Sequence, residues 1–167
     1  AISSAGIAGL ATEDVATFAP TDVAALNSRA LAAMSTENFA ALTSTQLAGL
    51  TTAQVAAVTT AQIGVLTTDD IDGLDTAQVG ALTSAQVAAL TDAQVQALTT
   101  AQISRLDAAD LLGLSTADMA LLSASQVGAL TLTQIAALST AQVRAIDAGD
   151  LAGLSTAAIK AMSSAQV

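Results

Sequence analysis

The sequence lacks most of the side chains on which enzymes depend. It contains no cysteine, histidine or tyrosine, and its one lysine is Lys160. Without cysteine there is no disulfide and no thiolate metal site. Catalysis by side chains usually needs an activated nucleophile or a base with a pKa near neutrality, and no phosphate loop, zinc spacing or dinucleotide motif occurs. We therefore expect no enzyme, no catalytic or cofactor-binding residues and no cofactor.

Aromatic residues are almost as scarce. Phe18 and Phe39 are the only rings in a chain of 167 residues that is 53% hydrophobic. Alanine is the commonest of the apolar residues, and the rest are mainly leucine, valine and isoleucine. We expect a core of thin layers in which these small side chains pack closely.

Basic residues are few and scattered. The chain has 14 acidic and 4 basic residues, a formal net charge of −10, and its basic residues stand singly at Arg29, Arg105, Arg144 and Lys160. Nucleic acids and anionic membranes require clustered lysine or arginine, so neither is an expected partner. A strongly acidic chain stays soluble and repels its own copies. This balance suits an extracellular or cell-surface location, which we predict.

Long apolar runs are also missing, although the mean hydropathy is +0.63. Ser, Thr or Asp interrupts the apolar residues every few positions, and no run approaches the roughly 18 residues of a spanning helix. We therefore expect no transmembrane segment. Residues 1–10 lack the basic start and long apolar stretch of a signal peptide.

Large apolar residues recur every eight positions along the whole chain. One row begins at Ile2 and reaches Met162, and a second row, five places later, runs from Ile7 to Val167. No insertion shifts the register. We number the places of each octad from the first row, so that Leu50 is place one and Val55 is place six. Such self-similarity at a fixed period is the mark of a repeat architecture.

Each octad also carries the signal that starts a helix. Place two is nearly always Ser, Thr, Asp or Asn, with Ala11 and Ala19 as exceptions, and place five is mostly Gln or Asp. In this capping box the cap oxygen accepts from the amide of the third helical residue, N3, and the N3 side chain accepts from the cap amide. The apolar places one and six then form the hydrophobic staple. The pattern predicts a helix start in every octad.

Proline and glycine fall where such helices begin and end. The single proline, Pro20, is at a first helical position, where its missing N–H costs nothing. Glycine occupies the last place of several octads, where a helix must stop. These glycines are Gly9, Gly49, Gly73, Gly113 and Gly153.

Neither one long helix nor a strand fits a period of eight. An α-helix turns about 100° per residue, so each apolar row would drift by about 80° per octad and leave no constant face to bury. In a strand, places one and six would lie on opposite faces. We therefore predict an all-α fold, a superhelical solenoid of very short N-capped helices, one per octad. Residues 1–167 form a single array from Ile2 to an incomplete octad at Val167, which we interpret as a piece of a longer repeat region.

A slower repetition of forty residues is superimposed on the octads. The segments DDIDGLD, ADLLGLS and GDLAGLS each carry Asp at place five and Gly at place eight, with the Asp at Asp70, Asp110 and Asp150. One hypothesis is that about five octads make one superhelical turn. The alternative is duplication of a forty-residue unit.

Four carboxylates within seven residues are the weak candidates for a metal site: Asp69, Asp70, Asp72 and Asp75. Ca²⁺ takes about six to eight oxygen ligands, but the segment lacks the EF-hand pattern. The interpretation that we favour makes Asp70 an N3 capping residue and Asp75 a cap, with Asp69 and Asp72 facing solvent. No metal is then expected.

Rows of threonine raise a second binding hypothesis. Thr51, Thr59 and Thr67, with the threonines that follow them, would present a regular lattice to ice if they lay on one flat face. Capping already explains these residues, and Ser, Asp or Ala replaces many of them through residues 107–164.

The repeated phrases LTTAQVAAV, LTSAQVAAL and LSTAQVRAI resemble the Ala- and Thr-rich octapeptide arrays of large repetitive bacterial surface or secreted proteins. The resemblance covers essentially the whole chain and implies a spacer, stalk or adhesion segment. Our first hypothesis is thus a structural or interaction module whose partners are the neighbouring domains of the same chain, with self-association through the array ends. The alternative is a binding module that uses the superhelix groove or the Thr rows for a peptide, glycan, ion or ice.

Overall fold

A computed structural model describes residues 6–7 and 9–166. Within these ranges the chain forms a succession of short α-helices and two 3-10 helices, without strands. The α-helices are α2 (Thr12–Ala16), α3 (Pro20–Ala24), α4 (Ser28–Ala32), α5 (Thr36–Ala40), α6 (Ser44–Ala48), α7 (Thr52–Ala57), α8 (Thr60–Gly64), α9 (Thr68–Gly73), α10 (Thr76–Val79), α11 (Ser84–Val87), α12 (Asp92–Ala97), α13 (Thr100–Ile103), α14 (Thr116–Leu121), α15 (Ala124–Gly128), α16 (Leu132–Ala137), α17 (Thr140–Ala145) and α18 (Thr156–Ala161). The 3-10 helices are η1 (Asp110–Gly113) and η2 (Asp150–Gly153). The predicted all-α solenoid with one helix per octad is confirmed, while Ile2 and Val167, the outer ends of the two apolar rows, lie outside the described residues.

The α-helices begin at the predicted caps, whereas η1 and η2 begin three residues after Asp107 and Asp147 and have no side-chain cap. Asp107 and Asp147 accept instead from the N–H of Ala109 and of Gly149, both at 2.8 Å. In α7 the Thr51 hydroxyl accepts from the Gln54 N–H at 3.3 Å, and the Gln54 side-chain oxygen accepts from the Thr51 N–H at 2.8 Å. Ala11 and Ala19 have no cap oxygen, so only the second half of the box remains there. Asp14 accepts from the Ala11 N–H at 3.3 Å, and Asp22 accepts from the Ala19 N–H at 3.0 Å.

The helices end without any left-handed residue in the described part of the chain, glycine included. The chain bends because place one and place two are extended: Leu74, for example, has φ −68° and ψ 138°, and the following cap, Asp75, has φ −73° and ψ 165°. Gly49 closes α6 with φ −78° and ψ −8°, angles open to any residue. Glycine at place eight is therefore not required by the backbone angles of the turn.

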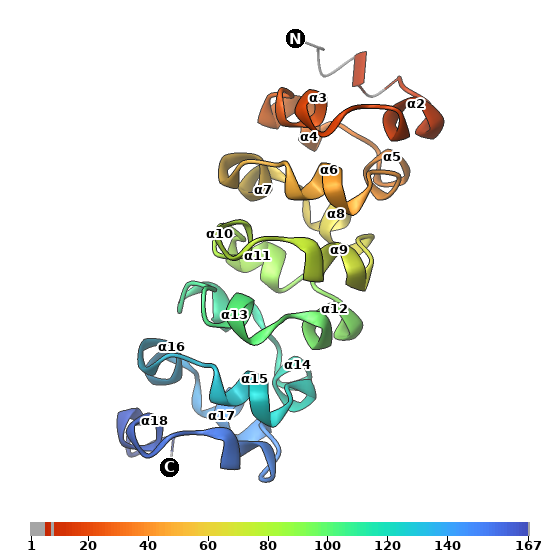
Figure 1. Ribbon diagram of the computed structural model, residues 1–167. Coiled ribbons are helices and arrows are strands. Elements are labelled where there is room, and N and C mark those ends of the chain that lie inside the picture. The colour runs from red at the N-terminus through yellow and green to blue at the C-terminus, as the bar shows by residue number, and fades with distance from the viewer. Residues whose placement is uncertain (1–5, 8, 167) are drawn as a thin grey trace.

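The helices coil into a superhelix that descends in layers from the N-terminal to the C-terminal end (Figure 1). Helices three octads apart pack on one another, as α3 does on α6, α6 on α9 and α9 on α12. Side-chain hydrogen bonds span 28 and 31 residues. One turn therefore takes between three and four octads, and the hypothesis of five octads per turn is wrong. The forty-residue spacing exceeds one turn, so the Asp-Gly octads do not lie in one column.

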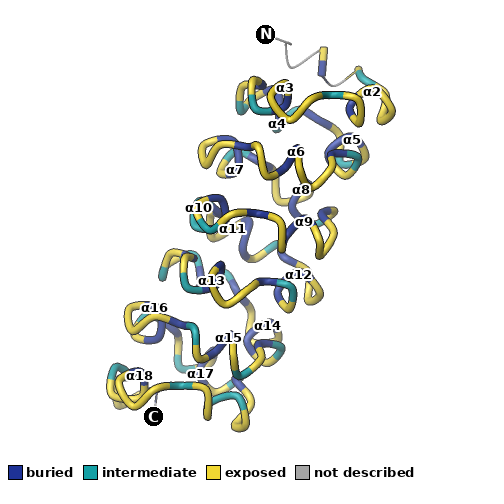
Figure 2. The backbone as a smooth tube through the Cα atoms, viewed as in Figure 1, coloured by how far each residue is buried: buried dark blue, intermediate teal, exposed yellow. Residues whose placement is uncertain are grey.

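The core follows the axis of the superhelix. Both apolar rows are buried except near the ends of the array, and Phe39 is among the largest fully buried side chains. Figure 2 shows buried segments facing the axis and exposed segments at the outer bends. Each layer is thin because one octad supplies two large side chains, as predicted.

Candidate functional site

The N3 glutamines are buried inside the solenoid, although they are polar. Their side chains are between 1% and 7% exposed. They recur in the octads wherever place five is not Asp, Asn, Ala or Gly. Within the described residues they are Gln46, Gln54, Gln62, Gln78, Gln86, Gln94, Gln102, Gln126, Gln134, Gln142 and Gln166. Such burial requires that both ends of the amide be hydrogen-bonded.

Gln94 in α12 shows how the amide is used. Its Oε1 accepts from the Thr91 N–H at 2.8 Å, which completes the capping box. Its Nε2 donates to the Leu66 carbonyl at 2.7 Å and to the Ile63 carbonyl at 2.8 Å. These acceptors lie 28 and 31 residues earlier, at the end of α8 in the preceding superhelical turn.

Every N3 glutamine named above makes the same pair of contacts at the same separations. From Gln46, which donates to Phe18 at 2.7 Å, to Gln166, which donates to Leu138 at 2.6 Å, these bonds join successive turns wherever N3 is glutamine. The place-six carbonyl also accepts from the N–H of the next place one, as Ile63 does from Leu66 at 3.2 Å, so the glutamine is its second hydrogen-bond partner. We call these bonds between turns the glutamine ladder. Each net hydrogen bond contributes about 0.5–1.5 kcal/mol.

The ladder explains why N3 holds glutamine and not glutamate. Both side chains can accept from the cap amide, but only the amide of glutamine also donates. The sequence predicted that the glutamine Oε1 accepts from the cap amide, but it did not predict that the Nε2 donates to the preceding turn. One signal was present: the two glutamates, Glu13 and Glu37, each stand one residue before N3, and none stands at N3. Asn38 at N3 also donates, to the Leu10 carbonyl at 2.9 Å.

Aspartate at N3 interrupts the ladder because its carboxylate cannot donate to the preceding turn. It accepts a hydrogen bond from that turn instead. Asp70 accepts from the Thr67 N–H at 3.0 Å and from the Thr67 hydroxyl at 2.7 Å. Its other oxygen accepts from the Ser44 hydroxyl, 26 residues earlier, at 2.7 Å. The Ser84 hydroxyl donates to Asp110 in the same way at 2.5 Å. At these octads the earlier turn donates and the later turn accepts.

Glycine at place eight lets two of these Asp octads approach the preceding turn closely. A Cβ on Gly113 of η1 would lie 2.5 Å from the Ser84 carbonyl oxygen of α11. A Cβ on Gly153 of η2 would collide with the Ala124 carbonyl oxygen of α15. The Asp70 octad differs, because a Cβ on its Gly73 would lie 3.7 Å from the Ser44 Cβ, an ordinary contact. Duplication of a forty-residue unit stays a prediction.

The acidic segment of α9 does not gather its carboxylates around one point. Asp70 is buried in the contacts given above, whereas Asp75 caps α10 and accepts from the Ala77 and Gln78 amides at 2.8 and 2.7 Å. Asp69 and Asp72 are exposed. Over residues 6–7 and 9–166 no group of three or more acidic side chains is placed to hold a metal ion.

The threonine rows wind around the solenoid. Thr51, Thr59 and Thr67 start successive helices, α7, α8 and α9, which lie at different positions around the superhelix (Figure 1). Each hydroxyl accepts from the N3 amide of its own helix. These rows do not form the single flat lattice that the ice-binding hypothesis required.

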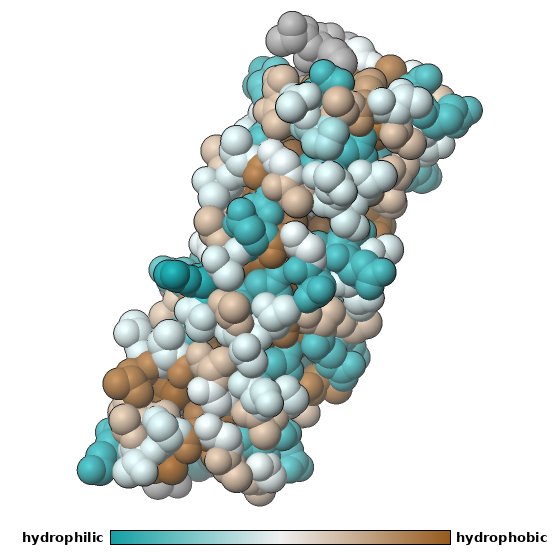
Figure 3. All heavy atoms as spheres, in the orientation of Figure 1, coloured by the Kyte–Doolittle hydropathy of each residue, from teal (hydrophilic) through white to brown (hydrophobic). Residues whose placement is uncertain are grey.

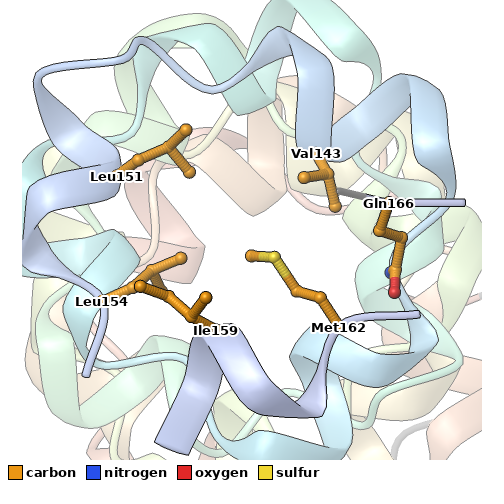
Figure 4. A pocket seen from close by; sticks show the side chains of 6 residues that line it. All are labelled: Val143, Leu151, Leu154, Ile159, Met162 and Gln166. Carbon is orange, nitrogen blue, oxygen red and sulfur yellow. The ribbon is translucent and has the colours of Figure 1, made fainter. Parts of the chain in front are cut away.

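The outer surface is mixed in character. The face in Figure 3 is covered mainly by hydrophilic and neutral residues, and apolar residues gather near its C-terminal end. At that end a pocket of about 260 Å³ opens, lined by Val143, Leu151, Leu154, Ile159, Met162 and Gln166 (Figure 4).

None of the described helices has the length and apolar character needed to cross a membrane.

Comparison with known proteins agrees with the repeat. No curated protein matches the chain. A family model described as the ALTTAQ repeat matches residues 15–52, 46–76, 71–108, 103–140 and 143–167. The letters TTAQ correspond to the cap, N1, N2 and N3 residues, as in residues 51–54 of α7. The chain is a structural repeat module, and it belongs to the ALTTAQ repeat family.

Proposed function

We propose that this array is a spacer or stalk, a structural or interaction segment that holds neighbouring domains of one large bacterial surface or secreted protein apart. The observation that carries the proposal is the glutamine ladder. At each N3 glutamine from Gln46 to Gln166 the same two bonds join one turn to the preceding turn. The number of octads therefore sets the length of the rod, and no single site is needed.

The physical properties of the array suit this role. Each turn contacts only its neighbours, so stability accumulates along the array. The net charge of −10 keeps such rods soluble and apart. In the described residues every buried side-chain nitrogen and oxygen has a hydrogen-bond partner, which supports a defined shape.

The proposal includes the absence of enzymatic activity and a location outside the cell or on its surface. The chain has no histidine, cysteine or tyrosine, and hydroxyls such as those of Thr51 and Ser115 are used as helix caps. The acidic composition supports the location.

The length of the rod provides the test. A variant without residues 51–106 loses seven octads, about two superhelical turns, in register. Helices pack about 8–10 Å apart, so small-angle X-ray scattering should show a maximum dimension about 16–20 Å shorter with an unchanged cross-section. Removal of residues 51–102 joins the octads out of phase and serves as the control, with an expected loss of ordered rod. An in-register deletion that leaves the length unchanged or widens the cross-section would contradict the proposal.

A further inference from the structure

Among the described residues, helix α14 makes no side-chain hydrogen bond to the superhelical turn before it. Its N3 residue, Asp118, accepts from the Ser115 N–H at 2.8 Å, which is the capping half of the box. A carboxylate cannot donate to the carbonyls 28 and 31 residues earlier, as an N3 glutamine does. No described side chain donates to Asp118 either. The start of α14 is therefore capped, but it is not joined to the preceding turn.

A second carboxylate stands where a donor to Asp118 would be expected. At the two other N3 aspartates described above, a serine 26 residues earlier donates from the preceding turn. The corresponding residue for Asp118 is Asp92, the first residue of α12, which packs on α14. An ionised aspartate only accepts hydrogen bonds. Place eight is Leu121, so this contact between turns cannot be as close as the contact that Gly113 makes.

The turn after α14 does not join this helix either. In the ladder the carbonyls at place six and at the following place one accept from an N3 glutamine 31 and 28 residues later. For α14 these are the carbonyls of Met119 and Leu122, and the N3 residue is Asp150 of η2, which has no amide. Of the helices from α5 to α16, η1 included, α14 is the one without an N3 amide bond to either neighbouring turn.

The C-terminal end of α14 lacks a backbone hydrogen bond as well. In every other octad whose ends are described, the N–H at the next place one donates to the place-six carbonyl, as Leu114 does to Leu111 at 3.1 Å. Leu122 does not donate to Met119 in this way. The Met119 carbonyl therefore has neither the backbone partner nor the side-chain partner that Ile63 has at the same place of α8.

We propose that α14 is a local opening point in the interior of the rod, where one helix detaches while the turns on either side remain packed. Ladder bonds anchor the chain before and after it, because Gln142 donates to Leu114 at 2.9 Å and Gln126 donates to Leu98 at 2.8 Å. Apolar burial remains to hold α14 between the turns, since Met119 is 0% exposed. Segments with few hydrogen bonds open at a lower free energy than the rest of a protein. This inference does not depend on the proposed spacer role.

Oxidation of Met119 by peroxide tests the proposal, because a buried methionine reacts when its surroundings open. Asp118→Gln supplies the missing amide, whereas Asp118→Glu has the same size and keeps only the capping half. We expect Asp118→Gln to slow the oxidation of Met119 about fivefold or more relative to the unmodified chain, because two hydrogen bonds are added. Asp118→Glu should give no protection. The buried Met34 lies in another turn, so it reports global unfolding and should be unaffected.

An unchanged oxidation rate at Met119 in Asp118→Gln, once circular dichroism has verified its fold, would overturn the proposal. Equal slowing of Met119 and Met34 would overturn it too, because both residues would then react through global unfolding.

Hydrogen exchange of the unmodified chain under native conditions gives a test that needs no variant. The amides at place six of α14, α12 and α15 are those of Met119, Val95 and Val127, and each donates to the carbonyl of its own cap at 2.9–3.0 Å. After correction for intrinsic rates, we expect the Met119 amide to exchange at least about tenfold faster than the other two. A common rate for the three amides would contradict a local opening of α14.

Discussion

Single atoms of the N3 side chain decide whether two turns are joined. Gln94 accepts from its own cap and donates to the turn before, and it is 1% exposed. Glutamate would keep the capping half and lose the donating half. Replacing glutamine by glutamate at N3 therefore removes the hydrogen bonds to the preceding turn and keeps the capping bond that starts the helix.

We expect Gln94→Glu to lower the free energy of unfolding at pH 7 by about 3 kcal/mol, because a buried acceptor left without a partner costs about 1–3 kcal/mol, and more next to a charge. Urea unfolding measures the change. The control is Gln96→Glu in the same helix, where the side chain is exposed. Equal stability of the two variants would contradict the ladder.

The same pair of variants should differ in pH dependence. Burial and the facing carbonyls raise the pKa of the introduced carboxyl at position 94 above its ordinary value of about 4.3. A raised folded-state pKa gives stability that is present at low pH and lost as the pH rises. We therefore expect the deficit of Gln94→Glu relative to Gln96→Glu to shrink as the pH falls from 7 to about 4.5. A constant deficit would argue against a buried carboxyl.

At the scale of the helix, no element of this chain is stable alone. The described helices are between 4 and 6 residues long, far below the roughly 12–15 residues that an isolated helix needs. Caps determine where each helix begins, and contacts three octads away hold it in place. Glycine at place eight matters where these contacts are closest.

Gly113→Ala and Gly64→Ala separate close packing from backbone preference. A Cβ at Gly113 would lie 2.5 Å from the Ser84 carbonyl oxygen, whereas at Gly64 the nearest atom, the Ala89 carbonyl oxygen, would be 3.8 Å away. We expect Gly113→Ala to destabilise by about 1–3 kcal/mol. Gly64→Ala should be neutral or stabilising by up to about 1 kcal/mol. Thermal and urea unfolding measure the change in the free energy of unfolding for both variants. A change of the same sign in the two would contradict the close packing of Gly113 against Ser84.

The sequence predicted the elements better than their arrangement. Caps and staples are local, so Thr51 and Gln54 were sufficient to place α7. The number of octads per turn depends on contacts such as Gly113 with Ser84 and Gln94 with Leu66. Nothing within a single octad encodes the separation of these residues. The hypothesis of five octads per turn assumed that residues forty positions apart in the sequence lie above one another in successive superhelical turns.

At the scale of the whole molecule, the described residues form one rod. Its core is continuous from Ile7 to Ala158, and its formal net charge is −10.

The central claim is that the chain returns to its own neighbourhood after three to four octads. The chain has no cysteine, so introduced pairs report proximity without background, since a disulfide needs Cα atoms about 4.4–6.8 Å apart. Ser44→Cys with Asp70→Cys joins positions 26 residues apart whose side chains are in contact. Ser44→Cys with Ser84→Cys spans forty residues. Under mild oxidation the account predicts an intramolecular disulfide for the first pair and none for the second, and a disulfide in the second pair alone would contradict it.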